Sequence, residues 1–206
     1  MPAFPRDNCT ERPLFGGAIS SSFPVRFQDV SDIRQVPDNQ EVFVDPSRDE
    51  SLIFELLELK HEVEDNASAA WFLRDLASEQ DAEESMVFEH TSIVEEAVGL
   101  RYRDVPALVS TAVGQMALSK GRQGREARNI VRVYLANLRL KEVATDVLIT
   151  SYEPIMINPL SESASSVGAG PSVPAAQSGC LPVAEVFKLA VTSFKVHHWN
   201  LFSPGS

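Results

Sequence analysis

The chain has 206 residues, with 29 Asp and Glu against 18 Lys and Arg, and its hydrophobic fraction of 44% is ordinary for a globular protein. The formal net charge of −11 disfavours nucleic acid and anionic lipid as partners and favours a protein with a basic face. No apolar run approaches the roughly 18 residues of a transmembrane helix, so we expect no membrane association.

The charge is distributed unevenly. Residues 29–104 hold 21 acidic side chains against 6 basic ones, a local net charge of −15, whereas residues 120–141 hold 7 basic side chains and 1 acid. The first residues lack the apolar segment of a secretory signal, and the two cysteines, Cys9 and Cys180, lie in segments that look flexible. This usage is typical of a reducing compartment, and we expect no disulfide framework.

The first elements surround a polar turn. Residues 1–12 are predicted to be a flexible tail, and a glycine-containing turn and a short strand follow. Val36–Asn39 places Pro and Asx residues where a β-turn requires them. Gln40–Asp45 alternates between two faces, which predicts a strand of period two.

Two helices are predicted next. Ser47 and Glu50 fit a capping box, and the apolar residues between Leu52 and Leu57 recur at helical spacing, which predicts a helix to Lys60. A second helix is predicted over residues 66–80.

The middle of the chain is predicted to be rich in strands. Candidate strands cover residues 86–90, 107–118, 129–140 and 146–152, and the last three form an antiparallel meander. The glycine-containing residues 120–125 are predicted to be a mobile turn within it.

The last third combines a loop with a helix. Residues 158–182 are small, polar and rich in Pro and Gly, which predicts a flexible loop. Residues 183–196 carry the cleanest amphipathic pattern of the chain, and their apolar stripe must pack on the sheet. Together the elements predict one α+β domain over residues 13–202, with helices layered on a mostly antiparallel sheet.

No motif predicts a catalytic, cofactor or metal site. Gly121–Arg125 lacks the spacing and the Lys-Ser/Thr ending of a phosphate-binding loop. His197 and His198 are adjacent and point to opposite faces, which makes a metal site improbable. Asp38 and Glu41 lie on a solvated turn rather than in a cleft that would separate their pKa values. These negatives favour a binding protein over an enzyme.

Several strings resemble one known family over residues 12–202. They are LFGGAI at Leu14–Ile19, DVS at Asp29–Ser31, RQVPDNQEVF at Arg34–Phe43, DESLIFELLE at Asp49–Glu58, TDVLIT at Thr145–Thr150, and the closing pattern from Phe194 to Phe202. In these strings the chain resembles the Ran guanine-nucleotide release factor family. The VPDNQEV core is specific, because no general rule of folding requires it.

The resemblance implies a fold and an activity. The fold is an α/β/α sandwich around a mostly antiparallel sheet of about six strands, shared with the PsbP-type extrinsic photosystem proteins. Members bind the small GTPase Ran, promote release of its guanine nucleotide without catalysing a reaction, and act in nucleocytoplasmic transport in the nucleus and the cytoplasm. The implied partners are Ran and other Ran-binding proteins, with no cofactor, and we expect a monomer.

The resemblance also implies a site. The acidic patch with which the family contacts Ran falls on Asp38 and Glu41 of this chain. The neighbouring residues are expected to form the rim or the scaffold of that patch: Asp32, Arg34, Pro37, Asn39, Gln40, Asp45 and Asp49.

Three alternatives stay open at the level of sequence. A PsbP-like structural subunit would need a lumenal targeting segment, which residues 1–12 do not supply. A protein-trafficking adaptor could bind without releasing nucleotide. A hydrolase with an unrecognised site would show a deep cleft that holds Asp or His with strongly shifted pKa values.

Overall fold

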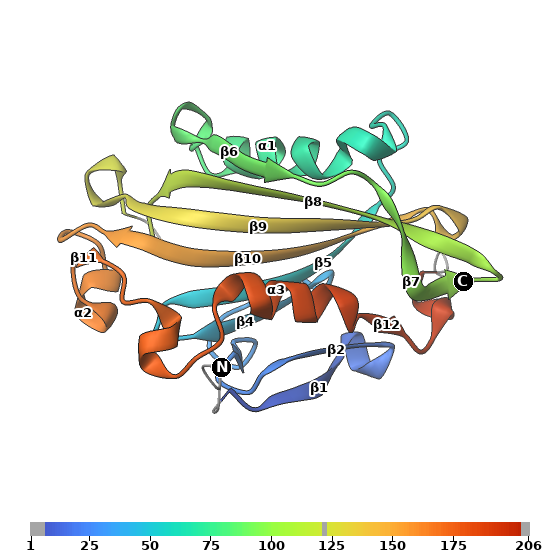
Figure 1. Cartoon of the computed structure of the whole chain (residues 1–206), viewed down its shortest axis with the longest axis horizontal. Coiled ribbons are helices and arrows are strands. Elements are labelled where there is room, and N and C mark those ends of the chain that lie inside the picture. The colour runs from blue at the N-terminus through green and yellow to red at the C-terminus, as the bar shows by residue number, and fades with distance from the viewer. Residues whose placement is uncertain (1–6, 121–122, 203–206) are drawn as a thin grey trace.

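A long, antiparallel sheet runs through the middle of the molecule (Figure 1). The structure is a computed structural model, and it describes residues 7–120 and 123–202. The main sheet has the order β3-β4-β5-β10-β9-β8-β6, with β7 also paired to β8 and β11 to β10. Its strands are β3 (Gln28–Asp29), β4 (Gln40–Asp45), β5 (Glu50–Glu58), β6 (Val87–Thr91), β7 (Glu95–Tyr102), β8 (Val105–Leu118), β9 (Asn129–Leu140), β10 (Thr145–Ile157) and β11 (Gly170–Pro171).

A second, smaller sheet joins the two ends of the described chain. It contains β1 (Cys9–Leu14), β2 (Ile19–Pro24) and β12 (Lys195–Val196), in the order β1-β2-β12. The helices are α1 (Ser68–Glu79), α2 (Ser163–Val167) and α3 (Val183–Thr192). Single 3-10 turns lie at Phe15–Gly17, Asp65–Ala67, Glu83–Ser85, Arg125–Ala127, Lys141–Val143, Ala175–Ser178 and Trp199–Phe202.

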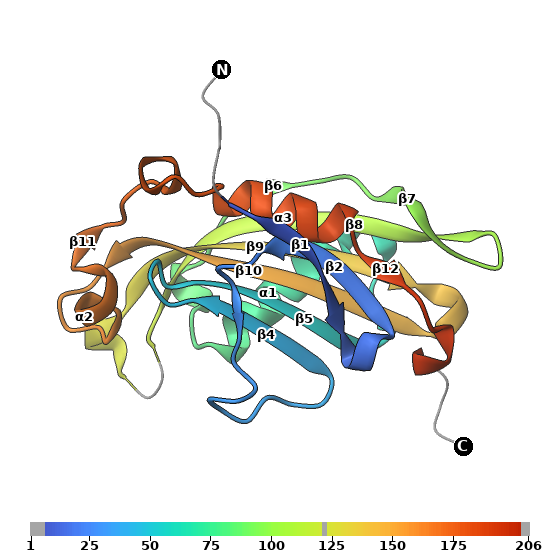
Figure 2. The same cartoon turned by 90° about the horizontal axis from the view of Figure 1, so that it is seen from below.

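The main sheet separates two hydrophobic cores. Helix α1 packs on one face over β8 and β9, while α3 and the small sheet cover the other face (Figures 1 and 2). Leu135 of β9 therefore packs beneath α1 with Phe72, and its neighbour Tyr134 packs beneath α3 against Phe187. Because β9 lies between two layers, it is apolar on both faces, as a strand covered on both sides must be.

Much of the predicted layout is confirmed. The strand at Gln40–Asp45 has the predicted bounds, and the meander of three long strands is β8-β9-β10. The helices predicted at 66–80 and 183–196 are α1 and α3. Helix α3 ends at Thr192 because Lys195 and Val196 leave it to pair with Ser20 and Ile19 of β2.

The predicted helix over residues 47–60 is wrong, since Glu50–Glu58 is strand β5. Ser47 caps no helix; its backbone N–H and its hydroxyl both donate to Asp45 Oδ1, at 2.9 and 2.7 Å. Strand β5 carries apolar residues on both faces: Leu52 and Phe54 point into the core beneath α3, and Ile53 and Leu57 lie on the side of α1. A short run that is apolar on both faces also has apolar residues at i, i+3 and i+4. For this reason the sequence pattern predicted a helix where the structure has a strand.

Three further differences concern boundaries and counts. The tail boundary predicted at residue 12 falls inside β1, which pairs with β2 from Cys9 opposite Pro24 onward. The predicted loop at 158–182 contains α2, β11 and a 3-10 turn, and Ser163 Oγ anchors it by donating to Asp49 Oδ2 at 2.6 Å. The expected six strands are too few, because the main sheet has nine in the described part of the chain.

Two expectations receive no test. The mobile turn predicted at residues 120–125 includes Gly121 and Arg122, which lie outside the described residues. The likeness to PsbP-type proteins stays a prediction.

A buried ionic cluster fixes the edge of the main sheet to the rest of the protein. We call Arg26, Asp7, Asp45 and Glu50 the Arg26 cluster. The Arg26 guanidinium lies 3.0 Å from Asp7 Oδ2, 2.7 Å from Asp45 Oδ2 and 2.6 Å from Glu50 Oε1, and it donates to the Leu181 carbonyl at 3.1 Å. The three carboxylates are 7%, 3% and 1% exposed. One cation therefore compensates three buried anions from separate segments, with Arg48 adding a second contact to Glu50.

Replacing Arg26 should destabilise the fold strongly. Arg26→Gln leaves Asp45 and Asp7 without a cation, and removal of one partner of a buried ion pair costs about 3–5 kcal/mol. We expect that loss in the free energy of unfolding, measured by urea denaturation. The matched control is Arg101→Gln, because Arg101 is exposed and has no ion pair among residues 7–120 and 123–202. Equal stability of the two variants would contradict a structural role for the cluster.

Candidate protein-binding surface

The β3–β4 loop, residues 30–39, lies at the outer edge of the main sheet beside β4 (Figure 2). Its first turn closes where the Val30 carbonyl accepts hydrogen bonds from the backbone N–H of Ile33 and of Arg34, both at 3.0 Å. A second turn closes from Gln40 N–H to the Pro37 carbonyl at 2.9 Å. The loop therefore contains two hydrogen-bonded turns, and the second, over Pro37–Gln40, lies one residue beyond the turn predicted at Val36–Asn39.

Both ends of the β3–β4 loop are attached to the sheet. At the start, Val30 N–H donates to the Val42 carbonyl at 3.1 Å. At the end, Asn39 exchanges bonds with Leu56: its carbonyl accepts from Leu56 N–H at 2.9 Å and its side-chain amide donates to the Leu56 carbonyl at 3.1 Å. These attachments hold the loop in a fixed position relative to β4 and β5.

Asp38 and Glu41, which share one predicted role, have different environments. Asp38 is exposed and forms no hydrogen bond or ion pair within the described part of the chain. Glu41 is half-buried, and its Oε1 accepts a hydrogen bond from Phe15 N–H at 2.8 Å. The Asp38 carboxylate is thus free to meet a cation of another molecule, while the Glu41 carboxylate already serves the fold.

The partner of Glu41 is held by an unusual turn. Phe15, Gly16 and Gly17 have φ angles of 50°, 68° and 87°, all in the left-handed region. Gly16 and Gly17 accept this conformation without strain because they lack Cβ. The turn points Phe15 N–H at Glu41 and so connects the LFGG string to the acidic string VPDNQEV, two motifs that the sequence shows only as separate.

The remaining predicted site residues divide into two groups. Asp32, Arg34, Pro37 and Asn39 are exposed in the same loop as Asp38, while Gln40 is half-buried at its end. Asp45 and Asp49 lie away from the end of the loop at Asn39, because the six residues of β4 from Gln40 to Asp45 span about 17 Å. Asp45 is 2% exposed within the Arg26 cluster, and Asp49 pairs with Lys120. Asp45 was predicted to belong to either the rim or the scaffold of the patch, and its burial makes it a scaffold residue.

One exposed residue of the loop escaped the sequence analysis. Ile33 is 81% exposed and lies between Asp32 and Arg34. An isolated Ile in a polar turn gives no periodic signal, and only the structure shows that its side chain points to solvent. Apolar side chains surrounded by charged ones are common at the centres of protein interfaces.

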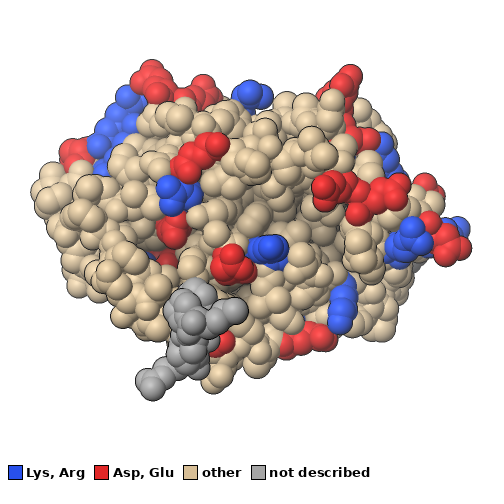
Figure 3. All heavy atoms as spheres, viewed as in Figure 1, with Lys and Arg blue, Asp and Glu red and all other residues tan. Residues whose placement is uncertain are grey.

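Charge is otherwise dispersed on the face that carries α3. The space-filling view shows acidic and basic groups scattered over this face, with an acidic and a basic group side by side near its middle (Figure 3). The acidic excess of residues 29–104 does not form one field on this face.

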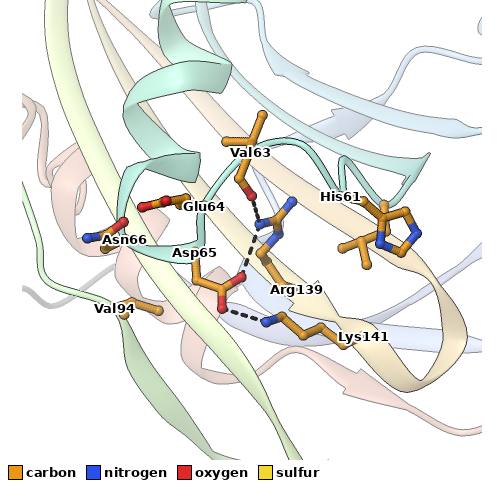
Figure 4. Close-up of a pocket in the computed structure, with 9 residues that line it drawn as sticks. His61, Val63, Glu64, Asp65, Asn66, Val94, Arg139 and Lys141 are labelled. Carbon is orange, nitrogen blue, oxygen red and sulfur yellow. Dashed lines mark hydrogen bonds and ion pairs between the residues drawn. The ribbon is translucent and has the colours of Figure 1, made fainter.

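A cavity of about 620 Å³ lies where Arg139 and Lys141 meet the turn before α1 (Figure 4). Its cations are already paired. Arg139 Nε lies 2.9 Å from Asp146 Oδ1, its Nη1 lies 3.1 Å from Asp65 Oδ1, and its remaining donors reach the carbonyls of Val63 and Lys60. The cavity is therefore bordered by a structural ion network rather than by groups free to bind an anion.

Within the described residues, no group of three or more His, Cys, Asp or Glu side chains is arranged to hold a metal ion. No helix described here combines the length and the apolarity needed to cross a membrane.

Asp65 provides a pH-dependent contribution to stability. Burial alone would raise the pKa of Asp65, but hydrogen bonds from Lys141 and Arg139 outweigh it and lower the pKa below 3.8. A folded-state pKa below the unfolded value means that the ionised group stabilises the fold above the unfolded pKa and that this is lost as the pH falls through the folded pKa.

Asp65→Asn should therefore be less stable than the parent at pH 7, by up to about 1 kcal/mol. The difference should shrink as the pH falls through the lowered folded-state pKa of Asp65. Thermal unfolding across pH measures it, and Asp104→Asn is the control, because Asp104 is exposed and unpaired among the described residues. A pH-independent deficit would contradict the ionic explanation.

The fold and the surface together define a class: an α+β domain with an exposed loop, attached to the sheet at both ends, that carries Asp32, Arg34 and Asp38. The family described as "Ran-interacting Mog1 protein" matches residues 12–154. The chain belongs to this family, which confirms the resemblance seen in the sequence.

Relatives and a solved structure agree. The chain is 40% identical to the Ran guanine nucleotide release factor of Danio rerio over 157 residues, 74% of this chain and 82% of the relative. It is 37% identical to that of Homo sapiens over 192 residues, 93% and 96% of the two chains. The crystal structure of the Saccharomyces cerevisiae Ran-binding protein Mog1p superimposes with a TM-score of 0.65 at 24% identity, over 96% of this chain and 100% of that chain, which supports the fold.

Proposed function

We propose that this protein binds the small GTPase Ran and promotes release of its bound guanine nucleotide, as a non-catalytic factor in transport between nucleus and cytoplasm. Membership of the Mog1 family supports the proposal, as do relatives named Ran guanine nucleotide release factor and, in Schizosaccharomyces pombe, nuclear import protein mog1.

The main observation behind the proposal is the exposed, unpaired carboxylate of Asp38. Its carboxylate is exposed, it has no cation of its own chain in the described structure, and it sits on a loop attached to the sheet at both ends. A fixed loop loses little conformational entropy when it docks, so its charge acts on a partner at small cost.

In the proposed interface Asp38 contacts a basic group of Ran, and Ile33 supplies an apolar contact beside it. Asp32, Arg34, Pro37 and Asn39 form the rim. The acidic excess of residues 29–104 accelerates encounter with a basic face, and this effect weakens as salt is added.

Release of nucleotide follows from linkage. A protein that binds both states of the GTPase equally shifts nothing, so the interface must favour the nucleotide-free form. The factor by which this protein weakens nucleotide binding then equals the factor by which nucleotide weakens its own binding. The protein needs no catalytic group for this activity.

Charge reversal at Asp38 tests the proposal. We expect Asp38→Lys to weaken binding to nucleotide-free Ran by about 2–5 kcal/mol if the pair is buried in the interface, with an unchanged circular dichroism spectrum. Binding is measured with Ran loaded with GTP, with GDP or with no nucleotide, and release with a fluorescent nucleotide. Unaltered binding and release would refute the assignment of Asp38, and binding of the parent protein without release would identify an adaptor instead.

Glu41 requires a pair of variants, because its carboxylate both accepts the hydrogen bond from Phe15 N–H and carries a negative charge. Glu41→Gln keeps a side-chain oxygen for Phe15 N–H, so it should keep most of the stability while it removes the charge. Glu41→Ala also removes the acceptor and should cost a further 1 kcal/mol or so in the free energy of unfolding. If the two variants lose Ran binding equally, the charge of Glu41 acts at the interface; if only Glu41→Ala loses it, Glu41 is a positioning residue.

A further inference from the structure

Helix α1 leaves part of its face of the main sheet uncovered. Beside the helix, over β5 and β10, lies a groove of about 340 Å³. Its floor is apolar and consists of Ile53, Leu57, Phe72, Leu76, Leu135 and Leu148. The volume is at the small end of the range of about 300–1,000 Å³ found for ligand sites, which suits a single long side chain.

The rim of the groove is acidic. Glu55 comes from β5, and Asp75 and Glu79 come from α1, one turn apart on the same side of the helix. Lys60 is the one cation among the residues that line the groove, and it forms no ion pair in the described structure. Like charges at this spacing destabilise a helix slightly, so the α1 pair is not explained by the stability of the helix.

Two groups in the groove lack a suitable partner. Glu55 accepts one hydrogen bond, from Gln40 Nε2 at 2.9 Å. Burial raises the pKa of Glu55, and the charges of Glu79 and Asp75 raise it further. Tyr152, which is partly buried, also lines the groove, and its hydroxyl forms no hydrogen bond among the described residues.

The chemistry of floor and rim selects one kind of occupant. A lysine or arginine side chain buries its methylene stem on apolar surface and keeps its charged head at the polar rim. In this groove the stem would contact Phe72 and Leu76, and the head would lie among Glu55, Asp75 and Glu79. A neutral apolar occupant would leave those carboxylates unpaired, at a cost in desolvation.

The groove is continuous with the β3–β4 loop. Gln40, the first residue of β4 and the neighbour of Asn39 in that loop, lines the groove and donates to Glu55. We propose that the groove receives one lysine or arginine side chain of the protein that docks on the β3–β4 loop; this rests on the proposed function.

The groove is tested first without Ran. Nα-acetyl-lysine N-methylamide is titrated into the ¹⁵N-labelled protein, and the norleucine analogue, which lacks the charge, is the matched probe. We expect the lysine probe alone to give saturable shifts of the amides of Glu55, Leu76 and Thr150.

Glu55→Gln and Glu79→Gln should each weaken binding of the lysine probe about fivefold, close to 1 kcal/mol, and Glu95→Gln on distant β7 should not. An equal response to norleucine, or none to lysine, overturns the proposal.

The same three variants are then measured against nucleotide-free Ran. We expect a loss of about fivefold for Glu55→Gln and Glu79→Gln and none for Glu95→Gln. Glu55 has a raised folded-state pKa, so its ionised form costs stability at pH 7 and Glu55→Gln should not lower the melting temperature. If both groove variants bind Ran as tightly as the parent protein does, the groove does not receive a lysine or arginine side chain of Ran. Failure of the parent protein to bind Ran instead refutes the proposed function, while the lysine titration still reports on the groove.

Discussion

The contact of Arg26 with three buried carboxylates is the interaction on which the arrangement of this protein depends. Asp7 precedes the small sheet, Asp45 ends β4, Glu50 begins β5, and the Leu181 carbonyl precedes α3. Burial works against the charge of Arg26, but the hydrogen bonds of Glu50 and Asp45 outweigh it and raise the pKa of the guanidinium. One side chain thus joins the sheet edge that carries the β3–β4 loop to the segments that precede the small sheet and α3.

The acidic residues of this chain perform separate tasks that a count of charges does not distinguish. Asp45 and Glu50 are buried supports, Glu41 connects a strand to the LFGG turn, and Asp38 is left to solvent. The local net charge of −15 is therefore a poor measure of the surface that a partner meets. Only the unpaired part of it contributes to recognition.

Periodicity predicted the elements that have one covered face or a regular stripe. Helix α3 is such a case, and regular alternation made β4 and the long strands of the meander visible. Strand β5 was mistaken for a helix because its neighbours β4 and β10 and the layers above and below leave it apolar on both faces. The string VPDNQEV marked the candidate site through resemblance. The bond between Glu41 and Phe15, the exposure of Ile33 and the groove beside α1 depend on tertiary contacts, which no local pattern contains.

The small sheet has a consequence for biosynthesis. Strand β2 is made early, but its partner β12 and the helix α3 that shields Phe23 and Phe54 come from residues 183–196. While the ribosome is still translating the meander, the part of the nascent sheet that α3 covers stays exposed, because β1 and β2 are the only described strands or helices of this cover made by then. The core on this face is therefore completed only after residues 183–196 leave the ribosomal exit tunnel. A chain that stops after the meander would be an aggregation-prone intermediate rather than a smaller functional protein.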